Sequence, residues 1–267
     1  MALGIIVCGV SGRMGGAVVR ALQQSSDLKL VAAIDRPGSA RLGKDAGEIA
    51  GAGHLGVPVT DKLDGALETN RVVIDFTHPE ASLGFLRGAA KTRIPIVIAT
   101  TGFNVTQQAE IKRLARRTPT LLSANTSLGV NVLVSLLGKA AKMLGDDYDV
   151  EIIEAHHRFK KDAPSGTALA LGRSVADALG RDLDKVALNG RKGIVGERSQ
   201  KEIALLSVRA GDIVGEHTVI FGGIGERLEF IHRAHSRDTF AHGALRAAQW
   251  LAKRKPGLYN MQDLLGL

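Results

Sequence analysis

The stretch Gly9-Val10-Ser11-Gly12-Arg13-Met14-Gly15 predicts the fold of the first half of the chain. It follows a short apolar strand, residues 4–9, and opens a helix expected over residues 14–25. Glycines permit a tight turn and let the backbone approach a pyrophosphate, while the helix N-terminus supplies N–H groups and a positive dipole end. The spacing is G-x-x-G-x-x-G and not the strict G-x-G-x-x-G, so taken alone the motif also fits a plain glycine turn.

Strands and helices alternate on both sides of this turn. The further strands of the first half are near-continuous runs of Val, Ile and Leu, and such runs are typical of parallel sheets covered on both faces. We therefore predict an α/β fold with an N-terminal Rossmann-like parallel sheet. The expected strands are residues 28–35, 71–76, 95–99 and 120–124; the expected helices are 79–91 and 107–117, with a short helix inside the glycine-rich stretch 38–56.

The pattern changes after Asn125. A helix (128–144), a strand (149–155) and a helix (165–179) precede three alternating segments, 202–209, 214–221 and 227–234, that are separated by glycine-rich turns. Alternation with such turns predicts an antiparallel sheet, hence a second, α+β domain with a mixed or antiparallel sheet. The last helix, 239–253, resembles those of the first half. We expect a dinucleotide-binding domain of residues 1–126 plus 237–267 and a second domain of residues 127–236.

Composition is that of an ordinary soluble globular protein: 267 residues, 45% hydrophobic and 23% charged, with a net charge of +8. The longest apolar runs, such as 130–137, are shorter than a membrane span, and the N-terminus leads directly into a strand, so we expect a cytoplasmic protein without a membrane partner. Scattered basic residues and 4% aromatics argue against a nucleic-acid partner. Cys8 lies within an apolar strand and is expected to be a buried hydrophobe.

Asp35 ends the second predicted strand, 20 residues after Gly15, at the position where an acid binds the ribose of NAD. Arg36 follows at once, at a position suited to the 2′-phosphate of NADP. Both coenzymes, NADH and NADPH, stay open. Three more predicted strands end in Phe76-Thr77, Thr100-Thr101-Gly102 and Ser123-Ala124-Asn125-Thr126, at the edge where ligands bind in open α/β sheets. Taken one at a time, each of these ends is also explained by Thr or Asn side chains that cap a loop. The cofactor-binding candidates are Gly9, Val10, Ser11, Gly12, Arg13, Met14, Asp35, Arg36, Phe76, Ala99, Thr100, Thr101, Ser123, Ala124, Asn125 and Thr126.

The loop from Glu154 to Thr167 reads Glu-Ala-His-His-Arg-Phe-Lys-Lys-Asp-Ala-Pro-Ser-Gly-Thr. Two histidines, an arginine and two lysines stand directly before a helix start that Ser165 is predicted to cap. Such a helix start binds carboxylates, and a histidine titrates near working pH. In an extended backbone His156 and Lys160 would face one way and His157 the other. No metal site is indicated, because adjacent histidines in a strand point apart and no cysteine lies near them.

This loop resembles the signature of the dihydrodipicolinate reductase family of bacterial diaminopimelate and lysine biosynthesis. The glycine motif, Asp75-Phe76-Thr77, Thr100-Thr101-Gly102-Phe103 and the segment 209–217 support the resemblance over nearly the whole chain. It implies an NAD(P)H-dependent reductase that converts the cyclic dicarboxylate 4-hydroxy-tetrahydrodipicolinate to tetrahydrodipicolinate. It also implies that residues 127–236 form a substrate-binding and oligomerisation domain and that the protein is a homotetramer.

The resemblance also implies roles for single residues. The family's acid–base histidine falls on His156 and its catalytic lysine on Lys160. His157, Gly166 and Thr167 fall on substrate-binding positions. Ala99 is a departure, because the family usually has glycine there, and the methyl group is expected to crowd the nicotinamide site slightly.

Two other classes of protein fit parts of the pattern. Another Rossmann dehydrogenase, of the amino-acid or semialdehyde type, would share the first half but lack the His-His-Arg-x-Lys and Ser-Gly-Thr combination. An NAD(P)-sensing regulator would keep the glycine turn without needing a histidine and a lysine beside a carboxylate site.

Overall fold

The computed structural model describes residues 2–63 and 65–267, and the chain divides into two compact units. The first comprises Met1–Leu128 and Arg237–Leu267, and the second comprises Gly129–Ser236. The C-terminal segment 237–267 therefore belongs to the first unit.

A sheet of seven parallel strands forms the centre of the first unit, in the order β12-β6-β5-β4-β1-β2-β3. The five predicted strands are present, and the short edge strands β3 and β12 are additional. The strands are β1 (Leu3–Cys8), β2 (Leu28–Ile34), β3 (Val59–Thr60), β4 (Arg71–Asp75), β5 (Ile96–Ile98), β6 (Pro119–Leu122) and β12 (Gly257–Tyr259). The Rossmann-like prediction is confirmed.

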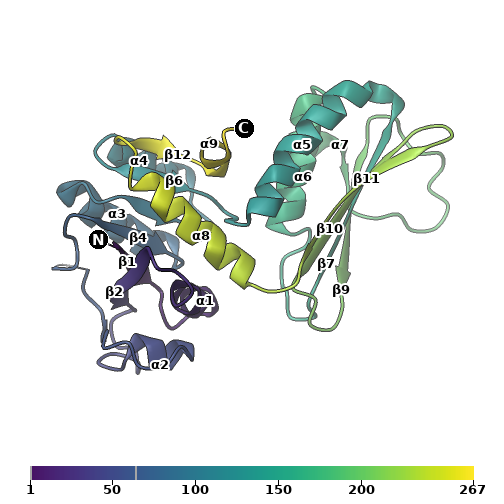
Figure 1. Ribbon diagram of the computed structural model, residues 1–267. Helices are drawn as coiled ribbons and strands as arrows, with labels where there is room; N and C mark the ends of the chain where they lie inside the picture. The colour runs from purple at the N-terminus through teal and green to yellow at the C-terminus, as the bar shows by residue number, and fades with distance from the viewer. Residues whose placement is uncertain (1, 64) are drawn as a thin grey trace. The chain divides into compact units, whose positions relative to one another are not determined.

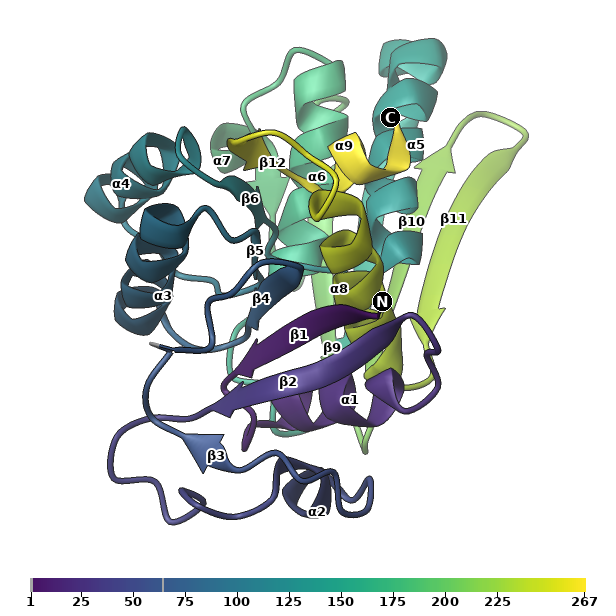
Figure 2. The same ribbon diagram turned by 60° about the vertical axis from the view of Figure 1, so that its left-hand side comes forward.

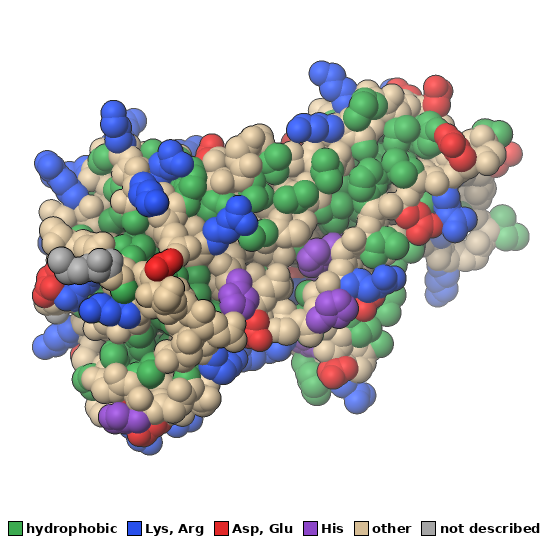
Figure 3. Space-filling view, viewed as in Figure 1, with side chains coloured by type: hydrophobic (Ala, Val, Ile, Leu, Met, Phe, Trp, Pro, Cys, Tyr) green, Lys and Arg blue, Asp and Glu red, His purple; other side chains and the backbone are tan. Residues whose placement is uncertain are grey.

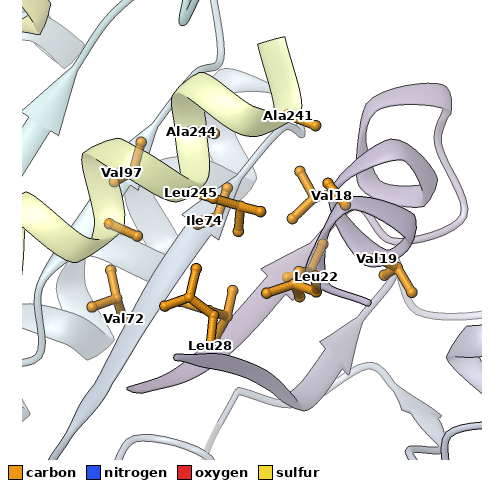
Figure 4. Packing of buried hydrophobic residues seen from close by; sticks show 14 of the residues in the cluster. Val18, Val19, Leu22, Leu28, Val72, Ile74, Val97, Ala241, Ala244 and Leu245 are labelled. Atoms are coloured by element: carbon orange, nitrogen blue, oxygen red, sulfur yellow. The ribbon is translucent and has the colours of Figure 1, made fainter. Parts of the chain in front are cut away.

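Helices cover both faces of this sheet (Figures 1 and 2). On one face, α1 and α8 bury Val18, Leu22 and Leu245 against β1, β2 and β4 (Figure 4). On the other face, α3 and α4 bury Leu86 and Ile111. Cys8 is buried on that face, as predicted. The helices are α1 (Arg13–Leu22), α2 (Ala46–Ala50), α3 (Pro79–Thr92), α4 (Val105–Ala115), α8 (Asp238–Leu251) and α9 (Met261–Leu265).

The second unit contains a five-stranded mixed sheet in the order β11-β10-β7-β9-β8. Its elements are α5 (Leu128–Leu144), β7 (Asp149–His156), α6 (Gly166–Ala178), α7 (Leu183–Val186), β8 (Ala187–Leu188), β9 (Ile203–Arg209), β10 (Gly215–Gly222) and β11 (Arg227–Ala234). The antiparallel pairs of this sheet are the two that β10 forms, with β11 on one side and β7 on the other. The prediction of a mixed or antiparallel sheet is confirmed as a mixed sheet. The narrower expectation that 202–209 continues an antiparallel run was wrong: β9 pairs parallel with β7, because α6 carries the chain back across the sheet.

The helical segment 128–147, which consists of α5 and the short 3-10 helix after it, is long and apolar enough to cross a membrane by length and composition alone. One face of it, with Leu133, Leu137 and Ala141, packs into the core of the second unit beside Ile152 and Phe221. A buried face of this kind identifies α5 as a core helix of that unit.

Candidate functional site

The glycine motif has the geometry of a phosphate-binding turn. Gly9 adopts φ +81°, a conformation that favours glycine, and Gly12 stands in extended conformation directly before α1. A Cβ on Gly15 would lie 2.2 Å from the carbonyl oxygen of Gly9, so only glycine permits this approach of helix to turn. The side chain of Val10 is buried in the core, which leaves only its backbone for a ligand.

Asp35 lies beside the same turn. Its carboxylate accepts hydrogen bonds from the Ser39 hydroxyl and the Arg36 backbone N–H, each at 2.8 Å. Burial opposes ionisation, but hydrogen bonds from Ser11 and Ser39 outweigh it and lower the pKa of Asp35. The ionised carboxylate is thus held next to Ser11 of the glycine turn, while the Arg36 side chain is exposed.

Six of the predicted cofactor residues meet at a second place in the first unit. They line a pocket of about 270 Å³ at the carboxyl edge of the sheet: Met14, Phe76, Ala99, Ala124, Asn125 and Thr126. Phe240 of α8 completes the lining, and its carbonyl accepts a hydrogen bond of 2.7 Å from Thr126. Sequence reasoning missed Phe240, because nothing local in the sequence marks a helix that returns from the end of the chain.

The side chain of Thr100 points away from solvent. Its hydroxyl donates to the buried carboxylate of Asp75 at 3.2 Å and accepts from the Thr77 backbone at 3.1 Å. Thr101 and Arg13 are exposed, and the Ser123 hydroxyl donates to the Asn125 carbonyl at 2.7 Å. Asp75 therefore joins the loops that follow β4 and β5, and Thr100 has only its backbone for a ligand.

The basic loop of the second unit follows the end of β7. The strand ends at His156, and the backbone N–H of Lys160 bonds to the carbonyl of His157, so the residues form a turn and not the extended alternation considered above. The Lys160 ammonium lies 2.9 Å from both carboxylate oxygens of Asp162. Arg158 and Lys161 are exposed.

Helix α6 begins at Gly166, and Ser165 caps it as predicted: the Ser165 hydroxyl accepts from the Ala168 N–H at 3.1 Å. The first-turn N–H groups, those of Gly166 and Thr167 among them, therefore lie at the positive end of the helix dipole. This end follows directly on the loop that carries His156 and Lys160, so a titratable donor and an anion-binding backbone occur together.

Three further residues surround His156, and sequence reasoning assigned none of them a role. Glu154 accepts from its Nδ1 at 2.6 Å, Arg209 binds Glu154, and the ring of His217 packs edge-on with 5.3 Å between ring centroids. Burial, followed by the neighbouring His156 and His232, lowers the pKa of His217 to about 3, so it is neutral at working pH. Strand alternation in the sequence already places Glu154 and His156, two residues apart, on the same face of one strand. Only the pairing of strands in the sheet shows that Arg209 and His217 lie beside them.

The described residues contain one group with the spacing of metal ligands, Asp45, Glu48 and His54. The Asp45 carboxylate already accepts four backbone hydrogen bonds, from residues 47, 48, 55 and 57, and caps α2. We interpret Asp45 as a structural cap.

Two family models match the chain: "Dihydrodipicolinate reductase, N-terminus" over residues 3–126 and "Dihydrodipicolinate reductase, C-terminus" over residues 129–265. The 4-hydroxy-tetrahydrodipicolinate reductase of Thiobacillus denitrificans is 52% identical over 100% of both chains. The enzyme of the same name from Syntrophus aciditrophicus is 51% identical over 98% of this chain and 97% of its own.

Among solved structures, the dipicolinate-bound dihydrodipicolinate reductase of Paenisporosarcina sp. TG-14 matches with a TM-score of 0.74 at 23% identity, over 98% of this chain and 99% of that one. An amine dehydrogenase from Mycobacterium smegmatis matches with a TM-score of 0.61 at 16% identity, over 98% and 95%. At these identities both structures show a shared fold.

Proposed function

The chain belongs to the dihydrodipicolinate reductase family, and from that premise we propose which of its residues carry out the chemistry. The protein is an NAD(P)H-dependent oxidoreductase that reduces 4-hydroxy-tetrahydrodipicolinate in the diaminopimelate and lysine pathway, as the relatives that share about half of its residues over their full length do. One reduced coenzyme, one proton and one hydroxylated substrate give tetrahydrodipicolinate, water and the oxidised coenzyme.

The proton is the part of this reaction that the residues of the second unit supply. Loss of the hydroxyl group together with a ring hydrogen, as water, uses no net proton and leaves a conjugated ring with an electron-poor carbon. When bound, NAD(P)H would supply a hydride to that carbon. Negative charge that develops on the adjacent ring atoms is neutralised by a proton from His156, whose imidazole is 12% exposed at the end of β7. Lys160, two residues before Asp162 in the same loop, is a second cationic donor. The observation that carries this assignment is the fixed position of His156 directly before the capped start of α6.

The two carboxylates of the substrate require two positive sites. The backbone N–H groups at the start of α6, Gly166 and Thr167, form one, because they lie at the positive end of the helix dipole. Lys160 forms the other, with His157 beside it. A relative's structure was obtained with dipicolinate, a planar ring dicarboxylate, which supports a site of this kind.

The coenzyme is assigned to the first unit, with the pyrophosphate on the turn from Gly9 to Met14 and the nicotinamide end in the pocket lined by Ala99. Asp35 is suited to the ribose hydroxyls of NADH and Arg36 to the 2′-phosphate of NADPH, so we propose that both coenzymes are used. Ala99 contributes a methyl group to the pocket wall, where the family usually has glycine.

We propose further that the protein works as a cytoplasmic homotetramer. Exposed hydrophobic side chains gather over α5 and β11 of the second unit: Val132, Leu136, Met143, Leu228 and Ile231 (Figure 3). Contiguous exposed apolar surface is typical of subunit interfaces. Light scattering is expected to give a mass four times the 28.2 kDa of the chain.

The decisive experiment follows the loss of NADH absorbance when substrate is generated by dihydrodipicolinate synthase. His156→Ala and Lys160→Ala are each expected to lower kcat by about 10²-fold or more, the usual contribution of a general acid, while NADH binding is unchanged. Lys161→Ala, the exposed neighbour, is the matched control and keeps wild-type turnover. Wild-type kcat in both His156→Ala and Lys160→Ala would refute the assignment.

A further inference from the structure

A buried carboxylate lies behind the proposed proton donor, and the reaction as described does not use it. Glu154 is 1% exposed and stands two residues before His156 on β7, so both side chains leave the same face of the strand. Its Oε2 lies 2.6 Å from Nδ1 of His156, and its Oε1 accepts from the backbone N–H of Ser165 at 3.0 Å. One carboxylate therefore contacts both the proton donor and the cap of α6.

Arg209 fixes that carboxylate. Register pairs Arg209 of β9 with His156 of β7, and its guanidinium donates to both oxygens of Glu154 at 2.8 Å. The same guanidinium donates to the carbonyl of Asp162 at 2.7 Å, within the loop that carries Lys160. A bidentate arginine is a strong and directional partner, so Glu154 has a single orientation. Burial opposes ionisation of Glu154, but the bonds from Arg209 and His156 outweigh it and bring its pKa to about 2.

An ionised carboxylate can only accept hydrogen bonds. Nδ1 of His156, which faces the Glu154 carboxylate, must therefore carry a proton. The nitrogen left to exchange a proton is then Nε2. Gly215 faces this nitrogen, and a Cβ at that position would lie 3.1 Å from Nε2, closer than most real Cβ contacts. Glycine at the start of β10 thus keeps this nitrogen uncovered by a side chain of residue 215.

The charges around His156 oppose one another. Burial lowers its pKa, and so do the cations Lys160 of the loop and Arg209 of β9. Glu154 of β7 raises it. His217 of β10 packs against the ring but is neutral at working pH. Of these groups, Glu154 is the one that favours the protonated imidazole. A histidine must be in this form to donate a proton.

We propose that Glu154, held in one orientation by Arg209, is a positioning residue. It accepts the Nδ1–H of His156, so that the transferable proton is on Nε2, and it also hydrogen-bonds to the backbone of Ser165 at the start of α6. This inference deepens the proposed function and rests on His156 as the proton donor. The same two oxygens hold His156 and Ser165, so donor and carboxylate site keep a fixed geometry relative to each other within the second unit.

Glu154→Gln tests this in the holoenzyme by the pH dependence of kcat. A proton donor loses activity as pH rises through its pKa, and removal of the Glu154 charge lowers the pKa of His156. The alkaline limb of the profile is expected to move to lower pH by about 1 unit, which makes kcat about tenfold lower above the limb. NADH binding is expected to be unchanged, because Glu154 lies in the second unit.

Glu151→Gln is the matched control. Glu151 lies on the same strand and also binds two arginines, Arg191 and Arg198, but within the described residues none of these bonds involves a histidine. Its profile is expected to coincide with that of the wild type. An alkaline limb that stays in place in a folded Glu154→Gln, judged by circular dichroism, overturns the positioning role.

Two measurements keep the inference testable if glutamine prevents folding. Glu154→Asp keeps the negative charge but moves it away from His156, because the aspartate side chain is one methylene shorter. This variant is expected to shift the alkaline limb of the kcat profile to lower pH by a smaller amount than Glu154→Gln. Nitrogen NMR of the wild-type protein, with the signal assigned by its loss in His156→Ala, is expected to show the Nδ1–H tautomer at high pH. An Nε2–H tautomer overturns the inference even when His156→Ala is inactive, whereas an active His156→Ala refutes the proposed function itself.

Discussion

Substitution of Gly15 by alanine tests the cofactor turn most directly. A Cβ at this position would lie 2.2 Å from the carbonyl oxygen of Gly9, 2.6 Å from Cα of Val10 and 2.8 Å from the carbonyl carbon of Gly9. Every one of these partners is backbone, so no side chain can rotate out of the way. An ordinary contact between carbon and carbonyl oxygen is about 3.3 Å, and the turn must therefore move from α1 by about 1 Å.

The expected cost follows from two opposing effects. Overpacking of this kind costs about 1–3 kcal/mol, and a backbone partner places the cost at the upper end. Alanine in a helix is favoured over glycine by about 1 kcal/mol. The net loss of about 2 kcal/mol lowers Tm by about 4–8 °C for a domain of this size. Displacement of one N–H from a phosphate costs about 1.5–3 kcal/mol, so the Kd for NADH rises at least about tenfold.

Gly16→Ala is the control for this substitution. Gly16 is the next residue of the same helix and is also buried, but the nearest atom to its Cβ is Nη1 of the Arg20 side chain at 3.4 Å. Thermal melts and NADH fluorescence titrations of both variants are the assay. We expect Gly16→Ala to melt at or above the wild-type temperature and to bind NADH normally. Equal melting temperatures and equal Kd values for the two variants would refute the close approach of turn and helix.

Three further substitutions test the charges and spaces of the two sites. Arg36→Ala is expected to raise KM for NADPH about tenfold and leave KM for NADH unchanged, since only NADPH carries a 2′-phosphate; equal changes for both coenzymes would contradict this role. Gly215→Ala places a Cβ 3.1 Å from Nε2 of His156 and is expected to lower kcat about tenfold without a change in NADH affinity by calorimetry; an unaltered kcat would show that Nε2 needs no space there. The pKa of Glu154 lies at about 2 against an ordinary 4.5, so its contribution to stability is present above pH 4.5 and is lost as pH falls toward 2. Urea unfolding is expected to show that the wild type loses about 2 kcal/mol more than Glu154→Gln between about pH 6 and pH 3, and parallel curves would argue against the ion pair.

The parts of the fold that local sequence specifies were predictable. A glycine turn between an apolar strand and an amphipathic helix determines a βαβ unit, because the backbone conformation of Gly9 and the close approach of Gly15 depend on residues a few positions apart. The capping of α6 by Ser165 was predictable for the same reason, because the Ser165 hydroxyl bonds to the N–H of a residue only three positions later, Ala168. Residues at the ends of parallel strands meet at one edge of the sheet, which is why six cofactor candidates scattered from Met14 to Thr126 line one pocket.

The mixed sheet of the second unit was not predictable in the same way. Alternation in 202–209 shows a strand but not its partner, and an antiparallel neighbour was the wrong choice. The parallel pairing of β9 with β7 brings Arg209 beside His156 and Glu154, residues more than 50 positions earlier in the chain.

By itself the sequence determined which residues have the chemistry: a histidine, lysines and a helix start in one loop, and glycines and hydroxyls at strand ends. The tertiary structure alone decided how that chemistry is oriented. Burial of Glu154 against Arg209 assigns the proton of His156 to one nitrogen, and the return of α8 adds Phe240 to the cofactor pocket. Capping and turn geometry depend on neighbours in the chain, whereas ionisation and tautomer depend on burial and on charges brought together by the pairing of distant strands.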